Sequence, residues 1–399
     1  SNHLTKILQL GPQPLANAFL KKSQLKKPEP FYPLDVYFCK NCSLVQLTDI
    51  VAPDILFKDY VYFSSTSPVF ISHFEELAKK TIARFALTNK SLVVDIGSND
   101  GILLKPFRKH GITVLGIEPA RNIAQLARKN NIQTVSEFFS KKLVANIKKK
   151  YGSAAIITAT NVFAHINDLD EVTEGVRELL DDNGVFIIEA PYLVDFLSKN
   201  LFDSVYHEHL SYFALSPLIP YFKNHGLTIF DVERVSTHGG SVRIFVSKNE
   251  TAHPRSSHVQ EFLKLEQKHK LNELSTYRQF AKRIAINKVA LKKIFAALTK
   301  NHKKIVGYGA PAKGNTLLNY FGISNKQLAY IVDDSVYKQG FYTPGTHIEV
   351  VSPNILITDP PDYILILAWN FADSIIKKLA NIKIRGIKYI IPVPKPKIL

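Results

Sequence analysis

The sequence contains no methionine, one tryptophan and only two cysteines among its 399 residues. Cys39 and Cys42 stand three positions apart, too few and too close for a framework of disulfide bonds. Nowhere do eighteen apolar residues follow one another, and the first residues lack the charged-then-apolar pattern of a secretory signal. These absences argue against a disulfide-rich secreted protein and against a helical membrane protein. We therefore expect a cytoplasmic protein.

Acidic residues are few compared with basic ones. The sequence has 34 Asp and Glu against 51 Lys and Arg, so its formal net charge is +17. Such an excess suits nucleic acid, anionic lipid or a small anionic ligand such as a nucleotide sugar. The lysines recur singly or in short clusters, as in 146–150 (NIKKK) and 300–304 (KNHKK). Scattered lysines are typical of a solvated surface, and we expect neither a nucleic-acid nor a membrane partner.

The order of apolar and polar segments predicts several domains. Residues 1–66 are rich in proline and lack a long periodic helix. Residues 67–250 alternate buried strands with amphipathic helices, which is the pattern of a parallel sheet covered by helices. A helical connector over 251–302 leads to a second alternation over 303–399. The predicted fold class is α/β, with a Rossmann-like domain followed by a second, smaller one.

The stretch VVDIGSNDGILL (93–104) carries the first strong signal for a ligand. A buried strand ends at Asp95, and the chain then passes Gly97 before a helix, whose free N–H groups can face a ligand. The second glycine of a dinucleotide-binding turn is absent, and Asp100 stands where a pyrophosphate would lie. The next strand ends at Glu118, placed to accept both ribose hydroxyls. The pattern favours S-adenosylmethionine over NAD, and a structural glycine turn is the alternative.

Four further residues extend this candidate cofactor site. Phe138 and Phe139 are placed to pack against an adenine, and burial in the core is the alternative for both. Asn161 and His165 follow a strand, so they lie at the sheet edge where ligands of such folds bind. A lone histidine is often structural, so His165 has two interpretations, as a structural residue or as a catalytic one. The cofactor-binding candidates are Asp95, Gly97, Asn99, Asp100, Glu118, Phe138, Phe139 and Asn161.

The stretch GYGAPAKGNT (307–316) opens the second α/β domain in a similar manner. A strand passes through Gly309 into a helix that begins near Lys313. Backbone N–H groups at a helix start, together with a lysine, suit a pyrophosphate. The following strand ends at Asp333, which is placed to hold a ribose or a base. An exposed lysine at a helix start is the alternative interpretation.

The stretch FDSVYHEHLSYF (202–213) concentrates two histidines, a glutamate and two tyrosines. On a strand His207 and His209 would share a face, which would suit a metal, but no third ligand is evident nearby. A proton-transfer site is the second interpretation, because histidine titrates near neutrality and a carboxylate can orient it. A strand of satisfied polar residues is the third.

Eight stretches together give the chain a specific resemblance to a known family. They are LGPQPLANAFL (10–20), FCKNCSLVQLT (38–48), YVYFSSTSP (60–68), VVDIGSNDG (93–101), YHEH (206–209), HGGSVR (238–243), VGYGAPAKGNTLLN (306–319) and TPGTHI (343–348). In this order the sequence resembles the S-adenosylmethionine-dependent C-methyltransferases that act on nucleotide-bound 4-keto sugars. The resemblance implies an N-terminal zinc-binding segment, a central methyltransferase domain and a C-terminal α/β domain that helps to hold the nucleotide sugar.

The resemblance also implies roles for individual residues. His209 is the general base that removes the proton beside the ketone, Glu208 assists it, and Tyr206 is a second candidate for the proton step or for binding the enolate. His207 is not carried over. We add Tyr62 and His165 to the catalytic candidates. The substrate-binding candidates are Ser64, Ser65, His238, Gly239, Gly240, Gly309, Lys313, Asn315 and Asp333, although the tyrosines near 62 could simply cap the core and HGG could be a plain hairpin turn.

The metal is where the sequence departs from the family. Cys39 and Cys42 form one C-x-x-C pair, which is half of a four-cysteine zinc site. The family has a second such pair near its N-terminus, and this sequence has none. Two thiolates alone do not close a tetrahedral site. The sequence therefore supplies only half of the ligands that a structural zinc ion needs, and bound zinc is doubtful for this chain.

The expected reaction moves a methyl group from S-adenosylmethionine to a carbon of a nucleotide-diphosphate 4-keto-deoxysugar through an enolate, with C3 as the acceptor by resemblance. The alternative among enzymes is an O- or N-methyltransferase that acts on another anionic small molecule. Such an enzyme would not require a base able to form an enolate. A cofactor-binding module without chemistry is the alternative outside them.

Overall fold

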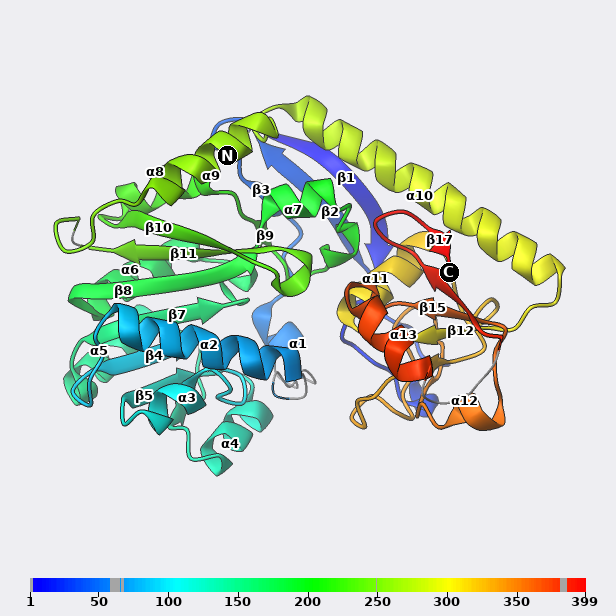
Figure 1. Cartoon of the computed structure of the whole chain (residues 1–399), viewed down its shortest axis with the longest axis horizontal. Coiled ribbons are helices and arrows are strands. Elements are labelled where there is room, and N and C mark those ends of the chain that lie inside the picture. Colours follow the sequence, from blue (N-terminus) through cyan, green and yellow to red (C-terminus); the bar gives the residue numbers. More distant parts are fainter. Residues whose placement is uncertain (1–2, 58–64, 66–67, 249, 381–385) are drawn as a thin grey trace.

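Two α/β lobes with a small sheet between them make up the structure (Figure 1). The computed structural model describes residues 3–57, 65, 68–248, 250–380 and 386–399. The middle of the chain forms the larger lobe and the C-terminal part forms the smaller lobe. The N-terminal strands and one long helix connect them.

The N-terminal segment folds into an antiparallel sheet, where the sequence pattern indicated only irregular structure. Its strands are, in spatial order, β1 (Leu4–Gln13), β2 (Tyr32–Cys39), β3 (Val45–Leu47) and β9 (Ser211–Tyr212). The pairing of β1 with β2 contains register shifts, and such irregularities obscure the alternation of a strand in the sequence. Because β9 belongs to the stretch 202–213, this sheet brings N-terminal residues beside the candidate catalytic residues. The short helix α1 (Pro53–Phe57) follows.

The larger lobe contains the predicted parallel sheet. Its order is β10-β11-β8-β7-β4-β5-β6, and only β11 runs antiparallel to its neighbours. Strands β5 and β6 lie on one side of β4, and β7 and β8 lie on the other, so the strand order reverses at β4. Sheets of this kind bind ligands at the carboxyl end of the strand where the order reverses, the switch point. The strands are β4 (Leu92–Ile96), β5 (Thr113–Ile117), β6 (Thr134–Val135), β7 (Ala154–Thr160), β8 (Leu180–Pro191), β10 (Thr228–Val235) and β11 (Ser241–Ser247).

Helices cover both faces of this sheet, which explains why every residue of β4 is buried. Side chains of α2 and α3 pack with Val93 on one face, and those of α5 and α6 pack with Leu92, Val94 and Ile96 on the other. The helices are α2 (Pro68–Arg84), α3 (Leu104–Lys109), α4 (Arg121–Lys129), α5 (Lys141–Tyr151), α6 (Leu169–Leu179), α7 (Leu193–Ser198) and α8 (Leu215–Asn224).

The sheet of the smaller lobe also has a switch point. In its sheet β12 lies between β13 and β15, parallel to both, so a second switch point lies at the carboxyl end of β12. The elements are β12 (Ile305–Tyr308), α11 (Ala312–Phe321), β13 (Ile331–Val332), β14 (Val350–Val351), α12 (Ile355–Thr358), β15 (Tyr363–Ile366), α13 (Ala372–Ala380), β16 (Lys388–Ile391) and β17 (Lys397–Ile398).

Two helices form the predicted connector, α9 (Ser257–Lys268) and α10 (Leu274–Lys300). Buried Glu266 fixes α9 to the larger lobe, because its carboxylate accepts hydrogen bonds from the N–H groups of Leu215 (2.6 Å) and Ser216 (2.9 Å) at the start of α8. From this anchor α10 runs along the N-terminal strands to the smaller lobe (Figure 1). The connector thus holds all three parts of the chain together.

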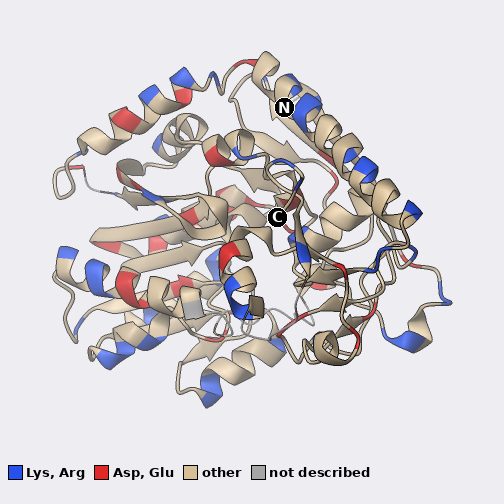
Figure 2. Ribbon diagram, turned by 45° about the vertical axis from the view of Figure 1, so that its right-hand side comes forward, with Lys and Arg blue, Asp and Glu red and all other residues tan. Residues whose placement is uncertain are grey.

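The positive charge is spread over the outer helices rather than gathered in one patch (Figure 2). This distribution agrees with the scattered lysines of the sequence. Among the helices that the structure describes, none has both the length and the apolar character needed to cross a bilayer.

A glycine before α3 gives a test of the local fold. Gly101 has φ +79°, and a Cβ there would meet Ile132 at 2.8 Å, whereas Gly111 has φ +76° and open space around it. Gly101→Ala should lower stability by roughly 2–5 kcal/mol through backbone strain and overpacking, and Gly111→Ala by about 1–2 kcal/mol through strain alone. Chemical unfolding of both variants measures the difference, and equal losses would contradict this account of the packing.

Candidate active site

A cavity of about 520 Å³ lies where the carboxyl ends of β4 and β12 face each other. Its wall is formed by Asn17 and Phe57 from the N-terminal segment, by the loops after β4, β5 and β7, and by the first turn of α11. Tyr206 and His209 belong to the same wall. The tertiary fold therefore brings candidate residues of both lobes to one cavity, and from the smaller lobe the candidate that lines it is Lys313.

The stretch 206–209 is a tight turn and not a strand. The N–H of His209 donates to the carbonyl of Tyr206 at 2.8 Å, which closes the turn. His207 points away from the cavity, and its Nε2 donates to the carbonyl oxygens of Tyr32 (3.3 Å) and Pro33 (3.2 Å). The expectation that His207 and His209 would share a face is wrong, because a turn sends successive side chains in different directions. His207 is a structural residue that fixes the N-terminal sheet.

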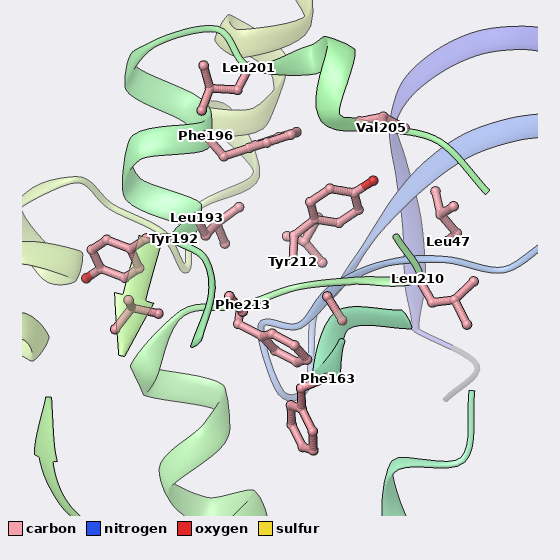
Figure 3. Packing of buried hydrophobic residues seen from close by; sticks show 14 of the residues in the cluster. Leu47, Phe163, Tyr192, Leu193, Phe196, Leu201, Val205, Leu210, Tyr212 and Phe213 are labelled. Atoms are coloured by element: carbon pink, nitrogen blue, oxygen red, sulfur yellow. The ribbon is translucent and has the colours of Figure 1, made fainter. Parts of the chain in front are cut away.

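Buried neighbours hold this turn in place. Val205 and Leu210 flank it and lie in the apolar cluster between the lobe and the N-terminal sheet (Figure 3). The N–H of Leu210 donates to Ala164, and its carbonyl accepts from Leu47, both at 2.8 Å. Both ends of the turn are therefore anchored, so the side chains between them keep a defined direction.

Tyr206 and His209 form a hydrogen-bonded pair. The Tyr206 hydroxyl lies 2.6 Å from Nε2 of His209, and Nδ1 of His209 lies 2.7 Å from the carbonyl oxygen of Ser204. A carbonyl only accepts, so Nδ1 carries the proton, and Nε2 of the neutral ring accepts from Tyr206. Burial holds the pKa of His209 well below its usual value, and the positive charge of Lys313 acts in the same direction.

The carboxylate expected to assist His209 is engaged elsewhere. Oε1 of Glu208 accepts a hydrogen bond from the amide of Asn17 at 2.6 Å, and the group that orients His209 is the Ser204 carbonyl. His165 ends the 3₁₀ turn after β7 (Phe163–His165), and its ring centroid lies 4.9 Å from that of His209. Burial lowers the pKa of His165 to about 4, so this ring is neutral beside His209.

Hydrogen-bond acceptors gather at the carboxyl ends of β4 and β5. Glu118 accepts from the N–H groups of Asn99 (3.0 Å) and Ala120 (2.9 Å), and its carboxylate lines the cavity. Asp95 accepts from the hydroxyl of Thr158 at 2.6 Å. Burial raises the pKa of Asp95 to about 7 and also raises that of Glu118. This wall offers oxygen atoms to a ligand that carries donors or positive charge.

Among the buried oxygens near this wall that have no hydrogen-bond partner within the described chain, two belong to residues that the sequence predicted to bind the cofactor. They are Oδ1 of Asn161, which lines the cavity, and Oδ1 of Asp100, whose other oxygen accepts from the N–H of Ser65 at 3.2 Å. Unpaired buried acceptors are costly unless a ligand supplies donors. With Glu118 they fit the ribose, ammonium and sulfonium groups of S-adenosylmethionine, and the residues present suit this cofactor.

Phe138 and Phe139, which the sequence did not distinguish, differ in the exposure of their side chains. Phe138 is 45% exposed and Phe139 is 8% exposed, although both reach the cavity. Phe139 packs against Gly175 of α6, where an added Cβ would come within 2.9 Å of its ring. Phe138 is the one whose ring is open to a ligand.

The opposite wall comes from the smaller lobe and carries cations. Lys313 donates to the carbonyl of His238 at 3.2 Å, and Lys338 donates to that of Ala310 at 2.9 Å. Asp333 shapes the turn between β12 and α11, because its Oδ2 accepts from the N–H of Ala310 at 2.6 Å. Burial lowers the pKa of His238 to about 3, with the charge of Lys313 acting in the same direction.

Several predicted residues lie outside the cavity wall. Asn315 donates to the carbonyl of Ala16 at 2.7 Å and so joins α11 to the N-terminal segment. An added Cβ would meet Leu201 at Gly239 (3.2 Å), Asp195 at Gly240 (2.3 Å) and Ala368 at Gly309 (2.9 Å), so packing accounts for these three glycines. Tyr62 and Ser64 lie outside the described residues.

Sequence reasoning also missed residues that line the site. Phe70 and Phe74 of α2, Asn17 and Lys338 lie in the cavity wall, and Ser204 orients His209 through its backbone. Asn17 stands in the family-like stretch 10–20, which was the available signal. The role of a backbone carbonyl leaves no trace in the identity of a side chain.

The cysteine pair sits on a hairpin between β2 and β3. The N–H of Ser43 donates to the carbonyl of Cys39 at 2.9 Å, and Cys39 is buried whereas Cys42 is exposed. Within the described ranges no three His, Cys, Asp or Glu residues form a group that could hold a metal ion. The thiols present supply two ligands, which do not fit a closed zinc site.

Three family models match consecutive parts of the chain. The model described as "Putative zinc binding domain" matches residues 1–57, "Methyltransferase domain" matches 70–232, and "C-methyltransferase C-terminal domain" matches 236–394. C-methyltransferase NovU of Streptomyces niveus is 36% identical over 393 residues, which cover 98% of this chain and 94% of that protein.

Solved methyltransferase structures are also similar to this chain. Magnesium protoporphyrin IX methyltransferase from Synechocystis matches with a TM-score of 0.34 and 14% identity, over 48% of this chain and 86% of that one. An S-adenosylmethionine-dependent methyltransferase from Clostridium acetobutylicum matches with a TM-score of 0.36 and 12% identity, over 44% of this chain and 91% of that one.

The curated relative is a C-methyltransferase, and it matches along nearly the whole length of both chains. Between transfer to carbon and transfer to oxygen or nitrogen, which the sequence alone left open, this match decides for carbon. The three domain models, in their order along the chain, agree with it. The chain therefore belongs to the S-adenosylmethionine-dependent C-methyltransferases.

Proposed function

We propose that the acceptor is C3 of a nucleotide-diphosphate 4-keto-deoxysugar. The observation that carries this proposal is the Tyr206–His209 pair, which lies in the wall of a cavity that both switch points share. Transfer to carbon requires removal of a C–H proton, and a carbon beside a ketone is acidic enough for this step. The basic smaller lobe suits the diphosphate of the carrier.

The hydrogen bonds suggest the path of the proton. Both ring nitrogens of His209 are engaged, Nδ1 by the carbonyl of Ser204 and Nε2 by the hydroxyl of Tyr206. The oxygen of Tyr206 therefore receives the proton from carbon while its own proton moves to Nε2. His209 ends as the protonated base, stabilised through Nδ1 by the Ser204 carbonyl. Glu208 supports the pair indirectly, because it binds Asn17 in the same wall.

The acceptor-rich wall of the larger lobe would hold S-adenosylmethionine, which supplies an electrophilic methyl group when bound. Glu118 binds the ribose hydroxyls, Phe138 lies against the adenine, and Asp100 and Asn161 accept from the amino-acid end. The substrate approaches from the side of α11. There the N–H groups of the first turn and Lys338 meet the diphosphate, and Asp333 keeps the preceding turn in shape.

The substrate class is tested with a thymidine-diphosphate 4-keto-6-deoxyhexose that carries deuterium at the acceptor carbon. We expect the product to gain one methyl group and to lose the deuterium, because the C–D bond must break before methylation. Methylation with the label retained would place the methyl group on another atom and would contradict the proposal.

His209→Asn and Tyr206→Phe should each lower kcat by roughly two to four orders of magnitude, the usual contribution of a general base. The affinity for S-adenosylhomocysteine should stay the same, because neither side chain belongs to the acceptor-rich wall. Steady-state kinetics and calorimetry measure the two effects. His225→Asn is the control, since His225 bonds to Tyr221 outside the cavity and its loss should leave kcat unchanged. Full activity in either site variant would refute the assignment.

The pH profile gives a second test of the base. The pKa of His209 is lowered, so its neutral form persists to a lower pH than in an exposed histidine. At saturating substrates kcat should stay level from about pH 8 down to the usual histidine pKa of about 6.5 and decline only below it. An acid limb with its midpoint above that value would argue against His209 as the base.

Phe138→Ala should weaken S-adenosylhomocysteine binding by about 1–3 kcal/mol without loss of stability, because its ring is open to the cavity. Phe139→Ala should instead lower stability by about 3–5 kcal/mol, because its ring is buried. Calorimetry and thermal unfolding of the two variants separate the roles. Equal effects on binding would contradict the distinction.

A further inference from the structure

Lys313 is a cation in the cavity wall with few partners. It lies in the first turn of α11 and is half-buried. Its ammonium donates to the carbonyl of His238 at 3.2 Å, and the described residues supply it with no further hydrogen bond or ion pair. An ammonium has three N–H donors. At least one donor is therefore free to bind a ligand in the cavity.

The ammonium shares the wall of the cavity with Tyr206, His209 and His238. Its charge lowers the pKa of both His209 and His238, in addition to the larger effect of burial on each. The ring of His238 packs against Phe70 of the larger lobe, with centroids 5.2 Å apart. By bonding to His238, Lys313 therefore reaches across the cavity from the smaller lobe to the side where His209 lies.

A buried carboxylate accompanies this lysine. Asp203 lies in the 3₁₀ turn Phe202–Ser204, directly before the residue whose carbonyl orients His209. Its Oδ2 accepts from the indole N–H of Trp369 at 2.6 Å, and its Oδ1 has no partner in the part of the chain that the structure describes. Burial raises the pKa of Asp203 and lowers that of Lys313, and the opposite charges of the two groups counteract both shifts without a direct ion pair.

This arrangement suits a single developing negative charge better than a diphosphate. A carboxylate beside the ammonium already offsets part of its charge, so a doubly charged group would meet repulsion from Asp203. In a pyranose the carbon that bears the diphosphate lies across the ring from C4. A cation close to the base at C3 is therefore near the C4 oxygen and far from the phosphates, for which the start of α11 and Lys338 remain available.

We propose that the ammonium of Lys313 binds the ketone oxygen of the sugar and stabilises the negative charge that forms there during proton removal. The C–H bond breaks, its proton passes to the Tyr206–His209 pair, and its electron pair moves onto the ketone oxygen as the enolate forms. When the enolate carbon forms its bond to the methyl group, the bond between methyl and the sulfonium sulfur breaks with its electron pair left on sulfur, and the C=O double bond of the ketone is restored. This role rests on the proposed function, and it replaces the pyrophosphate contact expected from the sequence.

The test compares Lys313→Met with Lys338→Met. Exchange of the acceptor-carbon hydrogen is followed by nuclear magnetic resonance in heavy water with S-adenosylhomocysteine bound, and thymidine diphosphate binding is measured by calorimetry. Lys313→Met should slow both exchange and methylation by about 10²- to 10³-fold, the usual effect of removing one oxyanion donor, with unchanged affinity for thymidine diphosphate. Lys338→Met should instead weaken thymidine diphosphate binding.

The outcomes separate this inference from the proposed function. If the wild-type protein exchanges the hydrogen and Lys313→Met exchanges it equally fast, the role of Lys313 is overturned while the proposed function stands. The same conclusion follows if Lys313→Met loses affinity for thymidine diphosphate but keeps full kcat at saturating substrate. A wild-type protein that neither exchanges nor methylates 4-keto sugars would overturn the proposed function, and the inference with it. Lys313→Gln, which keeps an N–H donor but no charge, should lose less exchange than Lys313→Met, so a folding defect in Lys313→Met alone does not decide the result.

Discussion

The hydrogen bond from Nδ1 of His209 to the carbonyl of Ser204 is the interaction on which the site depends. It fixes the ring as the tautomer that offers Nε2 to Tyr206, and only in that tautomer can the ring take up a proton from the tyrosine. A backbone acceptor adds no formal charge, so the buried ring stays neutral until the reaction charges it. The apolar anchors on both sides of the turn keep this bond in place.

Two sheets with their switch points facing one cavity give the site two walls of opposite character. The larger lobe presents the carboxylates of Asp95 and Glu118, and the smaller lobe presents the ammonium groups of Lys313 and Lys338. Under the proposed function, the cationic cofactor and the anionic nucleotide carrier would be drawn to different sides of the same space. The formal charge of +17 is consistent with this, although most of the lysines lie on outer helices (Figure 2).

The N-terminal segment takes part in the site even without a complete metal centre among the described residues. Its sheet includes β9, so it holds the end of the stretch that carries His209. Asn17 bonds to Glu208 at 2.6 Å, and Glu29 accepts from the N–H of Gly345 at 2.9 Å in the smaller lobe. The segment thus fixes both lobes relative to the turn, and a metal at Cys39 and Cys42 would stiffen a part that is already integrated by hydrogen bonds.

The sequence alone determined the α/β class and the position of most helices and strands, and it singled out the 206–209 stretch as a candidate site, because periodicity and residue type are local properties. It did not determine the N-terminal sheet, whose pairing is irregular and whose last strand comes from far along the chain. Only the tertiary structure decided that 206–209 is a turn, that Ser204 rather than Glu208 orients His209, and that Lys313 and His209 line one cavity. Each of these depends on backbone groups or on contacts between residues distant in sequence, and neither leaves a local pattern of side chains.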